Sequence, residues 1–162
     1  MYLNKEIPNS DPVNFNETVF DLSVENIQVV PAVAPFKVLF NRVAKGTETN
    51  VQLLSPGDIG ILETGTYHIS FSLAAKRDEA IATIGSMIAY LSINNLTSYG
   101  FGGQNTSPNF GTPLCANYDV CIRLLAGEIV RCYIYNKSLA GDITLNPIGR
   151  LYNSNLVITR VL

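Results

Sequence analysis

Residues 66–73 read Thr66-Tyr67-His68-Ile69-Ser70-Phe71-Ser72-Leu73, and this stretch decides the fold class. Every second side chain is apolar, which places four residues on one face: Tyr67, Ile69, Phe71 and Leu73. A period of two is typical of a β-strand that packs one face against a core, because successive side chains of a strand point to opposite sides. The preceding Glu63-Thr64-Gly65 predicts a turn.

Two later segments repeat this pattern on either side of a second turn. Residues 120–125 and residues 129–136 both alternate, and Ala126-Gly127-Glu128 between them predicts a tight turn. Their apolar positions form two sets, each on one side of its strand: Val120, Ile122 and Leu124, then Val130, Cys132 and Ile134. Two alternating segments around a short turn predict a β-hairpin.

Shorter strand signals fill most of the remaining chain. They cover residues 19–22, 27–30, 36–43, 51–54, 59–62, 87–93 and 156–162. The stretch Ser98–Asn117 is rich in Gly, Pro and Asn and predicts a long loop, while Ser72–Ile84 is the weak candidate for a helix. So many short strands separated by turns predict an all-β fold, a two-sheet antiparallel jelly roll of about ten strands.

Composition narrows the classes of protein that fit. The chain has 162 residues, of which 47% are hydrophobic and 15% charged, which suits one globular domain. Its net charge of −2 and scattered basic residues argue against nucleic acid as a partner. The longest apolar run, Ala80–Ile93, is interrupted by polar residues and is shorter than the roughly 20 residues of a membrane span, so no membrane insertion is expected. The first six residues lack the pattern of a secretory signal.

Three cysteines, Cys115, Cys121 and Cys132, occur late in the chain. Their spacing matches no zinc motif, and an odd number cannot pair completely within one chain. Buried or idle thiols are the favoured interpretation. The alternatives are a Cys115–Cys121 bridge and a cross-link between subunits, and the redox state of all three stays open.

The final strand suggests that something covers its outer side. In Leu156-Val157-Ile158 the chain is apolar on both faces, whereas antiparallel sandwiches usually keep one face polar. A second subunit could cover the outer face, and so could a loop of the same chain.

Taken in order, these segments resemble the globular head of complement component one-q and tumour necrosis factor. The bacterial branch at the end of Bacillus collagen-like exosporium glycoproteins is the most similar. Five segments between Phe36 and Leu162 carry the likeness: Phe40-Asn41-Arg42-Val43 followed by Asn50-Val51, Ile61 to Ile69, Leu91-Ser92-Ile93-Asn94-Asn95, Leu124 to Val130, and Asn153 to Leu162. Asn95 replaces the usual Gly, Glu128 replaces the usual Asp, and the collagen Gly-x-y repeat is absent.

The resemblance implies a jelly-roll head over residues 36–162 that packs as a homotrimer, with residues 1–35 as an N-terminal arm or extra strand that docks or anchors it. Its inner sheet would contain residues 36–43, 66–73, 120–125 and 156–162. The trimer interface would then include His68, Ser70, Ser72, Cys121, Arg123, Leu156 and Ile158. The core signature of the family would fall on Gly65, Tyr67, Phe71 and Gly127.

Few residues offer chemistry beyond assembly. His68 is the sole histidine, and no nucleophile–base pair or metal cluster accompanies it, so we expect neither an enzyme nor a cofactor. A trimer would gather its copies, which makes a pH-sensitive or ion-binding cluster the weaker alternative. Asp78-Glu79 could hold calcium, as in some family members, but a solvated charged loop is favoured. Aromatic residues in the predicted loop either face a ligand or cap the barrel: Tyr99, Phe101 and Phe110.

The leading functional interpretation is a non-enzymatic, homotrimeric display or adhesion domain on the surface of a bacterial spore or cell, in contact with other surface-layer proteins or glycans. One alternative is a receptor-binding or decoration domain of a phage fibre, which would place the chain on a virion. The other is a secreted module that binds glycans or another ligand. The sequence leaves the partner, the source and the size of any larger assembly undecided.

Overall fold

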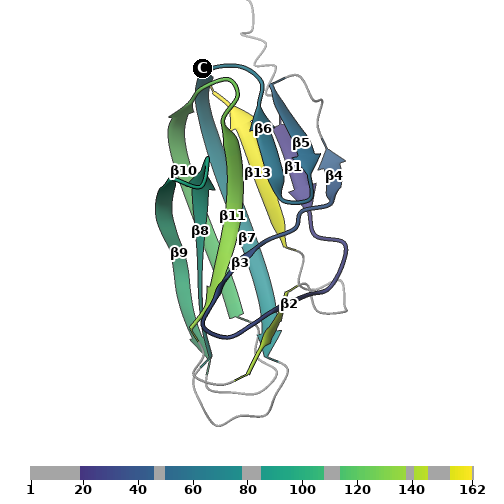
Figure 1. Cartoon of the computed structure of the whole chain (residues 1–162), viewed down its shortest axis with the longest axis vertical. Helices are drawn as coiled ribbons and strands as arrows, with labels where there is room; N and C mark the ends of the chain where they lie inside the picture. The colour runs from purple at the N-terminus through teal and green to yellow at the C-terminus, as the bar shows by residue number, and fades with distance from the viewer. Residues whose placement is uncertain are drawn as a thin grey trace, which may run out of the picture.

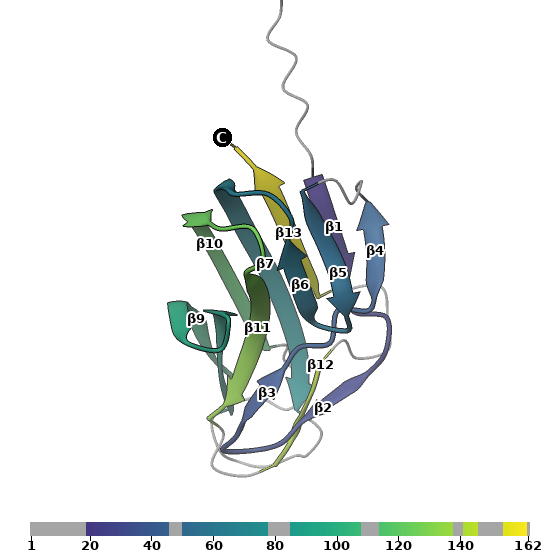
Figure 2. The same cartoon turned by 45° about the horizontal axis from the view of Figure 1, so that its top comes forward.

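The protein is a two-layer β-sandwich, seen here in a computed structural model that describes residues 19–45, 50–77, 85–107, 114–137, 141–145 and 154–161. Within these ranges the chain forms thirteen strands in two antiparallel sheets and no helix. Figures 1 and 2 show the two layers face to face. The predicted all-β class is confirmed, and no helix in the described ranges is long and apolar enough to cross a membrane.

Seven strands form the layer called sheet A, with the long β7 (Gly65–Arg77) at its centre. One edge of β7 pairs with β10 (Leu114–Leu124) over eleven residue pairs. Its other edge pairs first with β13 (Asn155–Arg160) and then with β12 (Ile143–Leu145). The outer strands of this layer are β1 (Val19–Ser23) beside β13, β4 (Arg42–Lys45) beside β1, and β2 (Gln28–Val30) beside β12.

Six strands form the opposite layer, sheet B, around β11 (Ile129–Asn136). One edge of β11 pairs with β8 (Gly85–Ile93), which in turn pairs with β9 (Thr97–Ser107). The other edge pairs with two short strands in succession, β6 (Asp58–Ile61) and β3 (Pro35–Lys37), and β5 (Val51–Ser55) lies beside β6.

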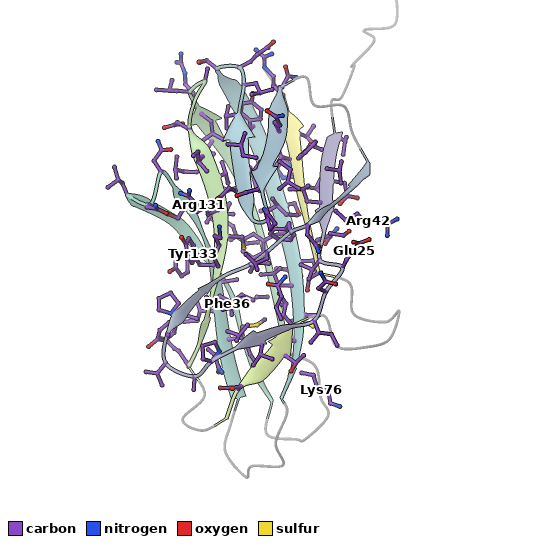
Figure 3. All side chains as sticks on the ribbon, turned by 45° about the vertical axis from the view of Figure 1, so that its right-hand side comes forward. Glu25, Phe36, Arg42, Lys76, Arg131 and Tyr133 are labelled. Carbon is purple, nitrogen blue, oxygen red and sulfur yellow. The ribbon has the colours of Figure 1, made fainter. Side chains whose placement is uncertain are left out.

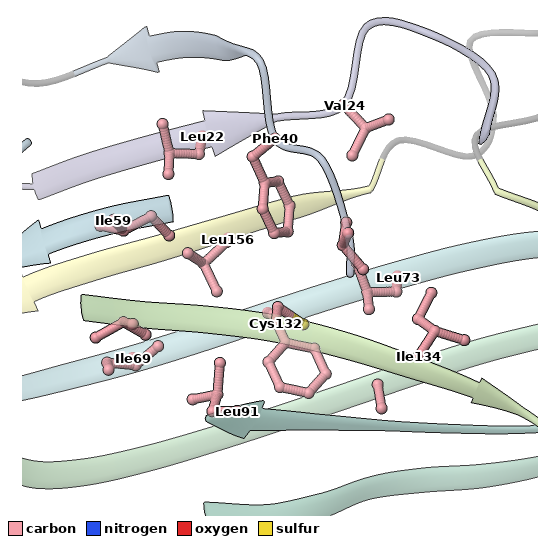
Figure 4. Close-up of a cluster of buried hydrophobic side chains, with 14 of the residues drawn as sticks. Leu22, Val24, Phe40, Ile59, Ile69, Leu73, Leu91, Cys132, Ile134 and Leu156 are labelled. Carbon is pink, nitrogen blue, oxygen red and sulfur yellow. The ribbon is translucent and has the colours of Figure 1, made fainter. Parts of the chain in front are cut away.

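The core lies between the sheets and follows the period of two. All four predicted inward residues of β7 are at most 1% exposed, and Val130, Cys132 and Ile134 of β11 are fully buried. Figure 4 shows side chains of both layers meeting there: Ile69, Leu73 and Leu156 of sheet A, and Leu91, Cys132 and Ile134 of sheet B. The alternation in the sequence therefore identified the buried face of both central strands.

The predicted hairpin of residues 120–136 is wrong, because its two strands lie in opposite sheets. Gly127 adopts a left-handed φ of 91°, and the backbone here bonds to the end of β6 instead of pairing back onto β10. The backbone amide of Gly127 donates to the backbone oxygen of Ile61 at 2.8 Å, and the backbone amide of Ile61 donates to the backbone oxygen of Glu128 at 2.9 Å. Because the turn bonds to the end of β6, the chain leaves sheet A here and continues as β11 in sheet B.

The single strand expected at residues 36–43 is also wrong, since this segment crosses between the layers. Phe36 belongs to β3 of sheet B, whereas Arg42 and Val43 belong to β4 of sheet A. Between them, Phe40 is fully buried in the core. The side-chain amide of Gln28 replaces a strand partner here. Its Nε2 donates to the backbone oxygen of Leu39 at 2.7 Å, and its Oε1 accepts from the backbone nitrogen of Leu39 at 2.9 Å.

Two further expectations need correction. Most of the loop predicted at Ser98–Asn117 is strand, namely β9 and the start of β10, although residues 108–113 lie outside the described ranges. The segment Ser72–Ile84, the candidate for a helix, is strand as far as Arg77, and residues 78–84 lie outside the described ranges. Residues 19–35, assigned from sequence to the N-terminal arm or extra strand, contribute β1, β2 and the start of β3 to the sheets.

Candidate self-association face

The outer side of sheet A, called the A face, is lined mostly by short side chains. Its residues come from β10, β7, β13 and β1, at the positions that alternate with the core. They are Asn117, Asp119, Cys121 and Arg123; Thr66, His68, Ser70 and Ser72; Asn155, Val157 and Thr159; and Val19, Asp21 and Ser23.

The register arranges these residues in straight rows across four strands. One row runs Asp119–Ser70–Val157–Asp21, and its neighbour runs Cys121–His68–Thr159–Val19. Directly opposed residues of an antiparallel pair lie about 4.5–5.5 Å apart at their Cβ atoms, so each row is closely spaced. Ser70, Val157 and Thr159 at the centre are short side chains, so they leave room for another sheet to approach.

His68 lies within this face beside an acidic neighbour. Its Nε2 is 3.3 Å from Oδ1 of Asp119, and both side chains are largely accessible, at 46% and 66%. Cys121 is the direct cross-strand neighbour of His68. In the part of the chain that the structure describes, no three His, Cys, Asp or Glu side chains are arranged to hold a metal ion.

The structure brings together five of the seven predicted interface residues and separates two. His68, Ser70 and Ser72 of β7 lie on the A face beside Cys121 and Arg123 of β10. Leu156 and Ile158 were wrongly placed, because both are fully buried in the core. The strand alternates, so Val157 and Thr159 take the outward positions on β13. Val157 is thus the apolar residue at the centre of the face.

The described cysteines are free and lie in three different environments. A Cys115–Cys121 bridge is excluded, because six residues along one strand span about 20 Å, far beyond the 4.4–6.8 Å Cα separation of a disulfide. Cys121 is exposed on the A face, whereas Cys132 is fully buried, and burial raises the pKa of its thiol. A cross-link between subunits remains a prediction.

The residues predicted as the core signature have clear structural roles. Tyr67 and Phe71 are buried in the core, and the Tyr67 hydroxyl donates to the backbone oxygen of Glu63 at 2.6 Å. This bond fixes the turn before β7 to the strand itself. Gly65 begins β7, and Gly127 supplies the left-handed turn between the sheets.

Sequence reasoning missed a polar cluster on the outer side of sheet B. Asp58 lies at its centre: Oδ1 accepts from Nζ of Lys37 at 3.1 Å and from Nε of Arg131 at 2.5 Å, and Oδ2 accepts from the Ser55 hydroxyl at 2.6 Å. Burial raises the pKa of the Asp58 carboxyl, but these three hydrogen bonds outweigh it and lower the pKa to about 2. The two cationic partners, Lys37 and Arg131, are 21 and 73 residues from Asp58, so no local motif reveals them.

The cluster continues along the sheet into aromatic residues. Nη1 of Arg131 donates to the Asn95 side-chain oxygen at 2.9 Å, and the Tyr133 hydroxyl reaches the same oxygen at 3.3 Å. Tyr133 stacks on Tyr90 of β8, with ring centroids 5.5 Å apart and an interplanar angle of 14°. Asn94 and Asn95 both have positive φ, which suits the tight turn between β8 and β9.

The remaining predicted sites lie in β9 or outside the described ranges. Tyr99 and Phe101 are in β9, beside β8, and do not belong to a loop. Phe110 and the proposed calcium residues Asp78 and Glu79 fall outside the described residues. The ligand-facing and calcium-binding roles therefore stay predictions.

Comparison with known proteins identifies the fold. No protein-family model matches the chain, and no curated protein sequence matches it. Among solved structures, murine APRIL at pH 5.0 is similar, with a TM-score of 0.62 and 12% identity over 90% of this chain and 99% of that one. The Eiger TNF from S. frugiperda gives a TM-score of 0.58 at 12% identity, covering 90% and 93% of the two chains.

The globular domain of zebrafish complement 1qA protein is also similar, with a TM-score of 0.51 and 14% identity over 90% of this chain and 96% of that one. The predicted jelly roll of the complement one-q and tumour necrosis factor type is therefore confirmed as the fold. At these identities the likeness describes the fold alone.

Proposed function

We propose that this chain is a non-enzymatic, homotrimeric head that self-associates through the A face and displays its other surfaces. The observation that carries the proposal is the combination of a jelly roll of this type with an outer face of sheet A whose central rows are mostly short side chains. The fold is shared with tumour necrosis factor-like and complement one-q-like domains, for which trimeric assembly is the expectation stated above.

The chemistry of the A face supports packing against a second copy. Val157 lies at its centre, directly opposite Ser70 of β7 and Asp21 of β1, and short side chains such as these lose little conformational freedom when another surface covers them. The outer side of sheet B carries the longer side chains Arg131, Tyr90 and Tyr133. Interfaces are not distinguished by bulk apolarity, so a polar face with an apolar centre is compatible with association.

The biological setting is proposed from the sequence. The likeness to the bacterial exosporium branch favours display or adhesion on the surface of a spore or cell, with other surface-layer proteins or glycans as neighbours. A phage fibre would use the same trimeric arrangement. The genes beside this one would discriminate between these settings.

The deciding experiment is the solution mass, measured by light scattering after size exclusion with and without reductant. We expect a species three times the 17.7 kDa of the chain, unchanged by reductant. Val157→Glu should convert it to a monomer that keeps its β-sheet circular dichroism, because charge is then buried at the centre of the face. Leu96→Glu is the matched control, since Leu96 is 89% exposed in a turn of sheet B and should leave the trimer intact. A folded, wild-type monomer at micromolar concentration would overturn the proposal.

A further inference from the structure

The charges of sheet B gather at a single point. Its six strands contain three charged residues, Lys37, Asp58 and Arg131, and all three meet in the cluster described above. Two cations share one carboxylate, which leaves a local charge of +1. The low pKa of Asp58 means that this carboxylate is ionised at neutral pH, so the excess is a single positive charge.

The cluster has spare donors and few spare acceptors. The carboxylate of Asp58 accepts three hydrogen bonds within the protein. An ammonium has three N–H groups and a guanidinium has five, and the bonds to Asp58 and Asn95 use one of Lys37 and two of Arg131. The Lys37 side chain is 31% exposed and can turn its remaining donors outward. A group that accepts hydrogen bonds and carries negative charge is the complement of this arrangement.

An aromatic surface adjoins the cationic point. Tyr133 follows Arg131 on the same side of β11, and Figure 3 shows the two along one strand. The stacked Tyr90–Tyr133 pair and the neighbouring Tyr135 are partly exposed. Tyrosines combine a rigid apolar ring with a polar tip, which suits ligands that have both C–H faces and hydroxyl groups.

We propose that this surface, formed by Lys37, Arg131, Asn95, Tyr90 and Tyr133, binds a saccharide that carries a carboxylate, such as a sialic or uronic acid. The carboxylate lies against Lys37 and Arg131, the sugar ring lies along the tyrosine pair, and Asn95 contacts a sugar hydroxyl. An inorganic anion would use the cations but not the tyrosines. This binding site goes beyond the proposed assembly and does not depend on it, because sheet B is the layer opposite the A face.

The test is a titration of the whole chain followed by two-dimensional amide NMR, with sialyllactose and lactose as probes that differ by the acidic sugar. We expect sialyllactose to shift the amide signals of the cluster residues in β3, β6, β8 and β11 with a Kd of about 1 mM. Lactose should bind at least about tenfold more weakly. The shifts with sialyllactose should diminish as salt is added, since the selecting interaction is electrostatic.

Three variants separate the two halves of the site. Lys37→Gln should weaken sialyllactose about three- to tenfold and leave lactose unchanged, because it removes a charged donor without opening the core. Tyr90→Leu should weaken both probes. Lys76→Gln removes an exposed lysine of sheet A and should change neither.

Four results would overturn the proposal. They are equal binding of the two probes, shifts located away from this cluster, no shift at about 10 mM sialyllactose, and stronger binding of an acidic tetrapeptide than of sialyllactose at the same residues. Equal binding of the two probes would mean that the carboxylate of the sugar is not recognised. Stronger binding of the tetrapeptide would mean that the surface is a peptide site. The titration reports on the site whether the chain is a trimer or a monomer, so failure of the assembly proposal would be seen separately.

Discussion

At the scale of single residues, Val33 has a backbone conformation that is unfavourable for its side chain. Its φ is 66°, in the left-handed region that a β-branched residue avoids, and its side chain is 67% exposed, so little burial compensates. We predict that Val33→Asn stabilises the protein by about 1 kcal/mol, because Asn tolerates this conformation. Urea unfolding measures the change. Val29→Asn, at an exposed position of β2, should instead destabilise it, and destabilisation by both would remove the argument from strain.

Asp58 couples the stability of the fold to pH. Removing its charge with Asp58→Asn leaves Lys37 and Arg131 facing each other without a carboxylate. We predict a loss on the order of 1 kcal/mol at neutral pH, less than the full pKa shift implies because solvent screens partly exposed pairs. The free energy of unfolding from urea titrations of the two proteins gives the difference.

The sign of the pH effect follows from the lowered pKa. A carboxyl that titrates at about 2 in the folded chain and at 3.8 otherwise stabilises the fold fully above the higher value. That stabilisation is lost as the pH falls from about 4 to about 2, so the wild type and Asp58→Asn should converge there. A difference that persists unchanged at the acid end would show that the bonds of Asp58 do not depend on its ionisation.

At the scale of strands, the sequence predicts which face of a strand is buried better than it predicts which strand it pairs with. Alternation found the buried residues of β7 and the bounds of β11, because a period of two depends only on local geometry. It could not say that residues 120–124 and 129–136 enter different sheets, since that choice depends on hydrogen bonds from Gly127 to the distant Ile61. β9 was mistaken for a loop because its three glycines and its polar residues lack a strand pattern. The same limit hid the Asp58 cluster, whose members meet only after folding.

Two glycines at strand connections provide a matched test of this geometry. Gly57 (φ 77°) and Gly127 (φ 91°) are both left-handed, but a Cβ on Gly57 would lie 2.3 Å from the Val38 backbone oxygen, whereas a Cβ on Gly127 would meet nothing within 4 Å. Gly127→Ala should therefore cost about 1 kcal/mol from strain alone, and Gly57→Ala at least about 3 kcal/mol because backbone must also move. Thermal unfolding of the two variants compares them, and equal losses would mean that the β5–β6 turn adapts freely.

At the scale of the whole molecule, the thiols report which face is covered. Cys121 is exposed on the A face and Cys132 is fully buried, with a raised pKa that also disfavours the reactive thiolate. We predict that a thiol reagent labels Cys121 at least about tenfold more slowly in the assembled protein than in a dissociated one, because the A face excludes the reagent. Cys132 should react only when the chain unfolds. Mass spectrometry of timed samples assigns each label.

The variant Val157→Glu makes this comparison at one protein concentration. It should release the chain as a folded monomer in which Cys121 reacts quickly and Cys132 remains protected, because the core residues beneath β13 are untouched. Fast labelling of both cysteines would mean that the substitution unfolds the chain, and the variant would then say nothing about the interface. Equally fast labelling of Cys121 in the wild-type assembly and in the folded monomer would place the contact elsewhere. In that case the subunits must meet through a different surface, and the short side chains of the A face have another cause.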